Sequence, residues 1–450
     1  ALTAGGWIPT VEMTSAPAGW TADFDIARRS LLIAPPAEYT DGMDLENTVT
    51  IQSDDKPILS QEYYVLDFTH PEGTIVYFDQ HMRYHEKVYE EINDNEIGNV
   101  LQDMYLANGK IYFITQNGKT SSMGTTFNGD GRFVVCDAHT MKRLVARDMP
   151  FYANIDTSTG ATQSSKSTLC WPQHIVVVSP EKAYIQYSTA DNESHSGIRI
   201  VDLQTNIIRT SDIPGTFGVF TKTGATKARM IFSRGKVFAG RGNSVIVLDP
   251  ATDAVIKTVT YENRQVKDLA KGYDGKIYAI FTGEFTGNSG MTGAASFTKP
   301  AMIVALDANG EVVSETNLPE QIELRTGTAS PTVQMCASFT QPHLYFIGKQ
   351  DFSAYEAMRY NYETGKVNWD YITADLDADH SGGDIIYGYM GVHPTTEQLW
   401  VGKSTYTQSA VHVYDVSRSD ALEFSSFYQK KASPAGVDFA YRFSDEWINK

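Results

Sequence analysis

Short apolar stretches that end at an Asp or Asn recur along the whole chain. In each copy, alternating hydrophobic residues stop at this residue, a short polar turn follows, and a second apolar stretch begins. Asp and Asn suit the position because their side chains bond to the backbone two residues on and close a tight turn. Each copy therefore predicts a β-hairpin. The seven turn residues are Asp67, Asp137, Asp202, Asp249, Asp307, Asn361 and Asp415.

A second repeated pattern lies between these turns. It is a short polar turn, often followed by a lysine, and then a strand with an aromatic residue, as at 108–113, 234–238 and 274–278. A further apolar stretch precedes it, for example at 174–178. Each unit therefore contains four strands, which we call A, B, C and D in chain order. Repeated four-stranded units of this kind are typical of β-propellers.

The predicted fold is an all-β, seven-bladed β-propeller of four-stranded blades, forming a single domain over residues 1–450, with residues 1–19 as an N-terminal extension. We expect N- and C-terminal strands to share one blade and close the ring, which protects the sheet edges. Apolar stretches at 24–26, 31–33 and 436–443 are the candidates for this blade. The predicted blades span approximately residues 20–80 plus 435–445, 100–150, 171–215, 226–262, 266–318, 335–377 and 388–430.

Connection lengths are unequal in a way that indicates a functional face. The A–B and C–D turns are short and share one face of such a propeller, whereas the B–C and D–A connections share the other. The long connections are all of the second kind: 115–131, 148–171, 187–196, 210–226, 282–300, 317–333, 372–386 and 403–410. Long loops on a rigid scaffold often carry function. We therefore expect this face to bind a ligand or partner. The alternative is that the loops lie on this face without a binding role.

Candidate ligand-binding residues come from two places on this face. Residues that start each A strand should ring the central channel, and aromatic residues in the long connections offer contact area. The mixture of amides, cations and aromatics suits a mid-sized polar ligand, although some of these side chains could instead point into the packing between sheets. The candidates are Gln102, Asp103, Phe127, Trp171, Gln173, Arg229, Lys267, Asp268, Phe285, Met335, Tyr387, Tyr389 and Tyr406.

Charge and composition exclude several classes of function. The net charge of −17 repels polyanions, so we expect no nucleic-acid partner. No run of about 18 apolar residues is present, so no membrane span is predicted. The three cysteines contain no CxxC pair, which leaves out a zinc knuckle or a dithiol redox motif.

One acidic stretch has spacing that suits a metal. Asp375, Asp377 and Asp379 alternate, and Asp384 follows. Oxygen ligands at this spacing can wrap Ca²⁺, but His380 stands where such loops need glycine. The alternative is a solvated acidic loop, and no other cofactor is expected.

Catalytic signatures are weak. Asp103, His174 and Asp268 could place acid–base groups near the channel mouth, but no GxSxG elbow, phosphate-binding loop or dinucleotide fingerprint appears in its proper context. We therefore expect a binding protein rather than an enzyme.

The repeat resembles those of YVTN-type propellers, most clearly at 245–253. The stretches 97–106, 387–396 and 411–415 look like surface-exposed propeller lipoproteins of Bacteroidetes, a group that includes a cobalamin-capturing partner of a TonB-dependent transporter. The resemblance implies an exported cell-surface protein of the outer membrane, anchored by an N-terminal lipid, that captures a scarce nutrient for such a transporter. Insertions at 84–98 and 148–171 leave a ferric siderophore, haem or a glycan as alternatives to cobalamin.

Two other functions stay open at this point. One is a lyase or lactonase working at the channel mouth, and the other is a protein-interaction platform without a small ligand. Fold-level resemblance alone does not decide among them.

Overall fold

The computed structural model describes the chain from Thr10 to Val437, with gaps. Side chains are described mainly between residues 87 and 416. The gaps are 14–20, 26–29, 35–48, 53–59, 64–73, 79–83, 86, 99–100, 116, 123–124, 131, 139, 149–151, 154, 157–160, 163–167, 190–194, 220–228, 287–295, 321, 325–334, 351–355, 373–384, 395, 405–407, 417–421 and 431–432.

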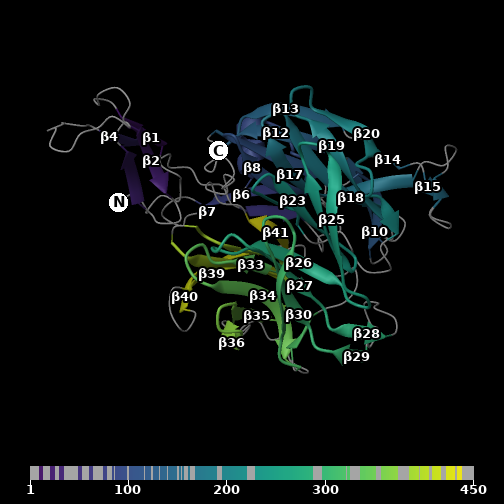
Figure 1. Cartoon of the computed structure of the whole chain (residues 1–450). Coiled ribbons are helices and arrows are strands. Elements are labelled where there is room, and N and C mark those ends of the chain that lie inside the picture. The colour runs from purple at the N-terminus through teal and green to yellow at the C-terminus, as the bar shows by residue number, and fades with distance from the viewer. Residues whose placement is uncertain are drawn as a thin grey trace.

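The molecule is an all-β propeller of four-stranded antiparallel blades (Figure 1). Six blades, numbered 1 to 6, are formed by consecutive strands in the order A-B-C-D. Blade 1 contains β8 (Leu101–Ala107), β9 (Lys110–Thr115), β12 (Arg132–Asp137) and β13 (Arg143–Asp148), and blade 2 contains β17 (Thr168–Ser179), β18 (Lys182–Thr189), β19 (His195–Asp202) and β20 (Ile207–Asp212). Blade 3 contains β22 (Ile231–Ser233), β23 (Lys236–Arg241), β24 (Ser244–Asp249) and β25 (Ala254–Thr260), and blade 4 contains β26 (Val266–Lys271), β27 (Ile277–Phe281), β30 (Met302–Leu306) and β31 (Val312–Asn317). Blade 5 contains β33 (Met335–Ala337), β34 (His343–Gln350), β35 (Glu356–Asn361) and β36 (Lys366–Ile372), and blade 6 contains β37 (Ile385–Val392), β38 (Gln398–Ser404), β39 (Gln408–Asp415) and β40 (Leu422–Lys430).

A further four-stranded sheet, the end sheet, joins the two ends of the chain. Its order is β41-β5-β6-β7, from β41 (Ser433–Val437), β5 (Ser60–Tyr63), β6 (Thr74–Phe78) and β7 (Tyr84–His85). The expected pairing of an N-terminal with a C-terminal strand is therefore present, between β5 and β41. The prediction of seven blades is corrected, because six blades are built from consecutive strands in the described part of the chain.

Part of the N-terminal region departs from the expected arrangement for a topological reason. The stretch predicted to enter the closing blade forms its own hairpin, β2 (Thr21–Asp25) with β3 (Ser30–Ala34). A second hairpin pairs β1 (Thr10–Met13) with β4 (Val49–Gln52). Because these strands bond to one another, the N-terminal share of the end sheet comes from residues after Pro57, and its strands are short.

The hydrophobic core lies between neighbouring blades. Alternate residues of each strand face opposite sides of a sheet, so each blade presents an apolar face to both neighbours. Tyr112 and Phe133 of blade 1 pack with Ile175 and Tyr187 of blade 2 in one buried cluster. Corresponding clusters lie between blades 2 and 3, 3 and 4, 4 and 5, and 5 and 6.

A sixth apolar cluster contains residues from the end sheet and from the blades on either side of it. Ile75 of β6 shares this cluster with Leu101 and Met104 of blade 1 and with Trp400 and Val413 of blade 6. The short helix α1 (Val88–Asn93) adds Tyr89, which is 1% exposed. The end sheet therefore joins blade 6 to blade 1.

Five of the seven predicted turn residues accept backbone N–H groups within their C–D turns, as predicted. Asp67 and residues 417–421 of the turn after Asp415 lie outside the described residues. Asp202 Oδ1 accepts the backbone N–H groups of Gln204 and Thr205, each at 2.9 Å, and these bonds are the main reason that the pKa of Asp202 is lowered. Asn361 Oδ1 accepts those of Glu363 and Thr364, each at 3.0 Å. Asp137, Asp249 and Asp307 make equivalent bonds.

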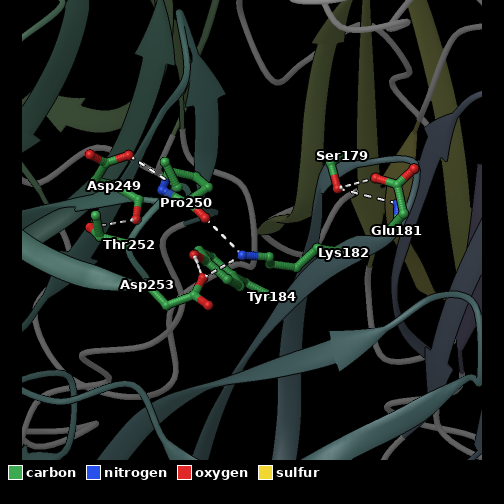
Figure 2. Close-up of polar contacts among 9 residues, drawn as sticks. Ser179, Glu181, Lys182, Tyr184, Asp249, Pro250, Thr252 and Asp253 are labelled. Atoms are coloured by element: carbon green, nitrogen blue, oxygen red, sulfur yellow. Dashed lines mark hydrogen bonds and ion pairs between the residues drawn. The ribbon is translucent and has the colours of Figure 1, made fainter.

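Polar side chains connect blades 2 and 3 on the face of the short turns (Figure 2). Lys182 of β18 donates to the Pro250 carbonyl at 2.7 Å and to Asp253 Oδ1 at 2.8 Å. The Tyr184 hydroxyl donates to the same Asp253 oxygen at 2.5 Å. The lysine and the aromatic residue of the second sequence pattern thus hold the C–D turn of the next blade. We call these contacts the Asp253 tie.

Every extra strand within blades 1 to 5 lies in a B–C or D–A connection. The extra strands in the described residues are β10 (Asn117–Ser122), β11 (Thr125–Asp130), β14 (Tyr152–Ala153), β15 (Ile155–Asp156), β16 (Ala161–Thr162), β21 (Gly218–Val219), β28 (Glu284–Thr286), β29 (Ser296–Lys299) and β32 (Ile322–Glu323). The labels of β10, β14 and β15 lie along one side of Figure 1, with β28 and β29 below them. The described part of the chain contains no helix long and apolar enough to cross a membrane.

Candidate functional site

The A strands contact one another around the ring, and three of them carry a bulge at the same place. The register of β8 against β9 shifts just before Asp103, that of β17 just before His174, and that of β26 just before Asp268. A bulge bends a strand locally and re-aims the side chain beside it. The three polar residues therefore occupy equivalent positions near the start of the A strands in blades 1, 2 and 4.

Asp103, His174 and Arg229 come together from three consecutive blades. Asp103 Oδ2 lies 3.3 Å from His174 Nδ1, and Asp103 Oδ1 lies 3.7 Å from Arg229 Nη2. The side chains of Asp103 and His174 are 4% and 1% exposed, whereas that of Arg229 is 15% exposed. Arg229 is thus the member of this group that solvent reaches most easily.

The two buried carboxylates also connect neighbouring A strands. Asp103 Oδ2 accepts the backbone N–H of Ile175 at 3.0 Å, and Asp268 Oδ2 accepts that of Met335 at 2.9 Å. In both cases the donor belongs to the A strand of the next blade. A hydrogen bond to a charged group contributes about 1.5–3 kcal/mol, so these contacts stabilise the centre of the ring.

Solvent exposure divides the predicted contact residues into two groups. Asp103, Gln173, Lys267, Asp268 and Met335 are buried. Gln173 donates to the Ser188 hydroxyl at 3.0 Å, inside its own blade. Gln102 and Arg229 are half-buried. The second group is therefore the more accessible one to solvent.

Several predicted site residues lie where side chains are not described. Phe127 belongs to β11, Trp171 to β17 and Phe285 to β28, while Tyr387 and Tyr389 belong to β37. Tyr406 lies outside the described residues altogether. So do the acidic residues predicted as Ca²⁺ ligands, Asp375, Asp377, Asp379 and Asp384. Among the described residues, no group of three or more His, Cys, Asp or Glu side chains is placed to hold a metal.

The structure adds a buried polar seam between blades 2 and 3 that the sequence patterns did not indicate. Arg241 of β23 is fully buried, and it donates through Nη2 to the Thr216 carbonyl. Burial lowers the pKa of Arg241 to about 9, although Tyr187 and Asp212 oppose this shift. On the blade 2 side, Gln186 and Ser196 are 0% exposed. The sequence gives no signal for a buried Arg241, because this residue ends an apolar strand and belongs to no recognisable motif.

Close packing in blade 2 depends on a glycine. A Cβ atom at Gly197 would lie 2.5 Å from Asp212 Oδ1 and 2.6 Å from the Tyr187 hydroxyl. Arg199 also contacts these two residues: its Nε lies 3.3 Å from Asp212 Oδ1, and its guanidinium lies 4.9 Å from the centre of the Tyr187 ring. The alternation of the strand therefore needs glycine here to make room for an ion pair and a cation–π contact.

Three solved β-propeller proteins are similar in structure at low sequence identity. Hydrazine synthase of Kuenenia stuttgartiensis is 11% identical, with 69% of this chain and 75% of that chain covered and a TM-score of 0.43. Dihydro-heme d1 dehydrogenase NirN, in complex with DHE, is 9% identical, with 97% and 76% covered and a TM-score of 0.43. Streptogramin B lyase is 13% identical, with 85% and 98% covered and a TM-score of 0.44. Likenesses this weak carry nothing about function.

The sequence comparisons place the chain in a family. No protein with a curated description matches it. A family model described as a domain of unknown function, DUF5074, matches residues 63–439, which include all six blades and most of the end sheet. The chain therefore belongs to the DUF5074 family.

Proposed function

We propose that this protein is a ligand-binding propeller that captures a mid-sized polar ligand on the face of its B–C and D–A connections. The observation that carries the proposal is the placement of the extra strands, all of which lie in these connections in the described part of blades 1 to 5. Loops and hairpins held by a rigid scaffold form pre-organised binding surfaces, which lowers the entropy lost on binding.

Arg229 and Gln102 supply the polar contacts at the channel in this proposal. The 3.7 Å separation of Arg229 Nη2 from Asp103 Oδ1 exceeds a hydrogen bond, and Arg229 Nε has no hydrogen-bond partner among the described residues. A buried N–H without a partner costs free energy that a ligand acceptor can offset. Asp103 keeps the guanidinium in place through its charge.

We further propose that the ligand is a scarce nutrient, cobalamin-like or a siderophore, delivered to a TonB-dependent outer-membrane transporter. In this proposal the chain is a cell-surface lipoprotein held by an N-terminal lipid. The support is the resemblance of 97–106, 387–396 and 411–415 to such lipoproteins. The chain as a whole is strongly acidic, so the cationic group of Arg229 is the feature that favours a ligand with a hydrogen-bond acceptor or an anionic group.

In this proposal the end sheet closes the ring between blade 6 and blade 1. Its shared core with blades 1 and 6 supports that role, since Ile75 packs in the same cluster as Met104 and Trp400. A closed ring holds the A strands at fixed spacing, which a pre-organised channel mouth requires.

Thermal unfolding with a ligand panel tests the proposal. We expect one of cyanocobalamin, a ferric siderophore or haem to raise the unfolding temperature in proportion to ln[ligand], because a ligand that binds only the native state stabilises it by mass action. Arg229→Ala should weaken this response about tenfold or more in apparent affinity, the loss expected for a charged hydrogen bond. Arg209→Ala, at an exposed arginine of β20, is the matched control. An equal response from both variants would remove Arg229 from the site, and no response to any ligand would remove nutrient capture.

A further inference from the structure

A hollow lies on the outer edge of blade 1. It forms between the segment after α1 and the outer strand β13. Asn93 holds the segment to that strand, because its Nδ2 donates to the Met141 carbonyl at 3.0 Å and its Oδ1 accepts the Arg143 N–H at 2.8 Å. We call this feature the arginine hollow, lined by Asn95, Glu96, Arg132, Arg143, Arg147 and Asp148.

Two of the three arginines of the hollow, Arg143 and Arg147, form no ion pair with a described residue. Arg143 Nη1 donates to the neutral amide oxygen of Asn95 at 2.9 Å. Arg132 Nη1 donates to the Glu96 carbonyl at 3.3 Å, and its Nε is 4.0 Å from Asp148, whose side chain is 88% exposed. Arg147 is exposed, and its side chain has neither a hydrogen bond nor an ion pair within the part of the chain that the structure describes. An exposed pair of this kind contributes about 0–1 kcal/mol, so Asp148 neutralises little.

We propose that the arginine hollow binds a polyvalent oxyanion, a small ligand that carries carboxylate or phosphate groups. Its volume of about 770 Å³ falls within the range of small-molecule sites, which is roughly 300–1,000 Å³. Guanidinium groups match carboxylate and phosphate oxygens with paired hydrogen bonds. Three arginines and two acidic residues line the hollow, so its formal charge is positive although the whole chain has a net charge of −17.

The acids of the hollow define how selective it is. A ligand with several oxyanion groups can engage more than one guanidinium at once, whereas a singly charged anion pairs with one of them and is still repelled by Glu96 and Asp148. We therefore expect the hollow to prefer a ligand with two or more oxyanion groups that are spaced to meet separate arginines. It is separate from the channel-mouth proposal, because none of its residues belongs to an A strand.

Isothermal titration with citrate and with inorganic pyrophosphate, at constant ionic strength set by NaCl, tests the proposal. We expect saturable binding of at least one of them to the full chain. The double variant Arg143→Gln/Arg147→Gln should weaken binding at least tenfold. Arg209→Gln, which replaces an exposed arginine on the outer strand of blade 2, should leave it unchanged.

The outcomes separate the alternatives. Binding of citrate alone identifies a carboxylate ligand, and binding of pyrophosphate alone identifies a phosphate ligand. Equal affinity of wild type and double variant overturns the proposal, as does heat that NaCl reproduces at the same ionic strength. Far-UV circular dichroism of the double variant, expected to equal that of wild type because both side chains are exposed, shows that lost binding is not lost folding.

Discussion

Single side chains in this propeller show how burial changes ordinary chemistry. Burial raises the pKa of the Cys136 thiol to about 12, so the native protein keeps it neutral and unreactive. Burial also shifts the pKa of His343 in blade 5, but downward, because the charged form of histidine is the protonated one. Burial, followed by the charge of Arg359, lowers the pKa of His343 to about 4.

His343 should make the fold sensitive to mild acid. Because its folded pKa lies below the unfolded value of about 6.5, the unfolded chain binds more protons in between. This contribution to stability is complete above pH 6.5 and is lost as the pH falls toward 4. His343→Gln should therefore lose less unfolding free energy than wild type between pH 7 and pH 5, by about 1 kcal/mol after allowance for solvent screening. Urea unfolding at both pH values measures the difference; parallel losses in the two proteins would contradict it.

Each blade is a unit whose two patterns act on its neighbours as well as on itself. The Asp or Asn closes the C–D turn, whereas the lysine and the aromatic residue can reach into the turn of the next blade. The left-handed backbone of Asp253, with φ of 51°, places its carboxylate where Lys182 and Tyr184 meet it. Neighbouring blades are thus connected by polar contacts at the rim and by apolar contacts within.

Removing the carboxylate of the Asp253 tie should destabilise the fold. Asp253→Ala leaves the Tyr184 hydroxyl without its acceptor and Lys182 without its charged partner, at a cost of about 1–3 kcal/mol. Asp253→Asn tolerates the same backbone conformation and can still accept from Tyr184, so we expect it to cost less than half as much. Denaturant unfolding of both variants, each alone and combined with Tyr184→Phe, measures the coupling. If Asp253→Ala costs as much in the Tyr184→Phe background as in wild type, the tie contributes nothing through the hydroxyl.

At the scale of the whole molecule, the last strand decides whether the ring is held closed. β41 pairs with β5 and contacts β37 of blade 6 and β8 of blade 1. Without it, β5 would lose its hydrogen-bonded neighbour and become an open edge.

Deletion of residues from 433 onward should lower stability far more than its length suggests. We expect a fall in unfolding temperature of more than about 5 °C and a tendency to aggregate, because an unpaired edge strand and exposed apolar surface are both created. A synthetic peptide with residues 433–450 added in trans should restore part of the loss, whereas a scrambled peptide should not. An unchanged unfolding temperature after the deletion would show that the end sheet does not close the ring.

Local patterns were sufficient to predict the repeated four-stranded unit. Turn chemistry and strand alternation depend on near neighbours only, so the four-stranded units and their short turns were predictable from residues such as Asp202 and Asn361. The contact among Asp103, His174 and Arg229 was decided by the tertiary structure, and their role in binding a ligand stays a prediction. The number of blades built from consecutive strands was not predictable from local patterns. The strands Thr21–Asp25 and Ser30–Ala34 could pair with each other or with the C-terminal strand, and local sequence does not distinguish the two pairings.

The sequence by itself determined the propeller class of the fold and the order of strands in each blade, since these follow from short-range periodicity and from up-and-down connectivity. Tertiary structure alone decided which polar residues are buried. The carboxylates of Asp103 and Asp268 were candidates for a ligand, yet each is bonded to the next A strand. Burial depends on how twisted sheets and bulges bring distant strands together, and no local pattern records that distance.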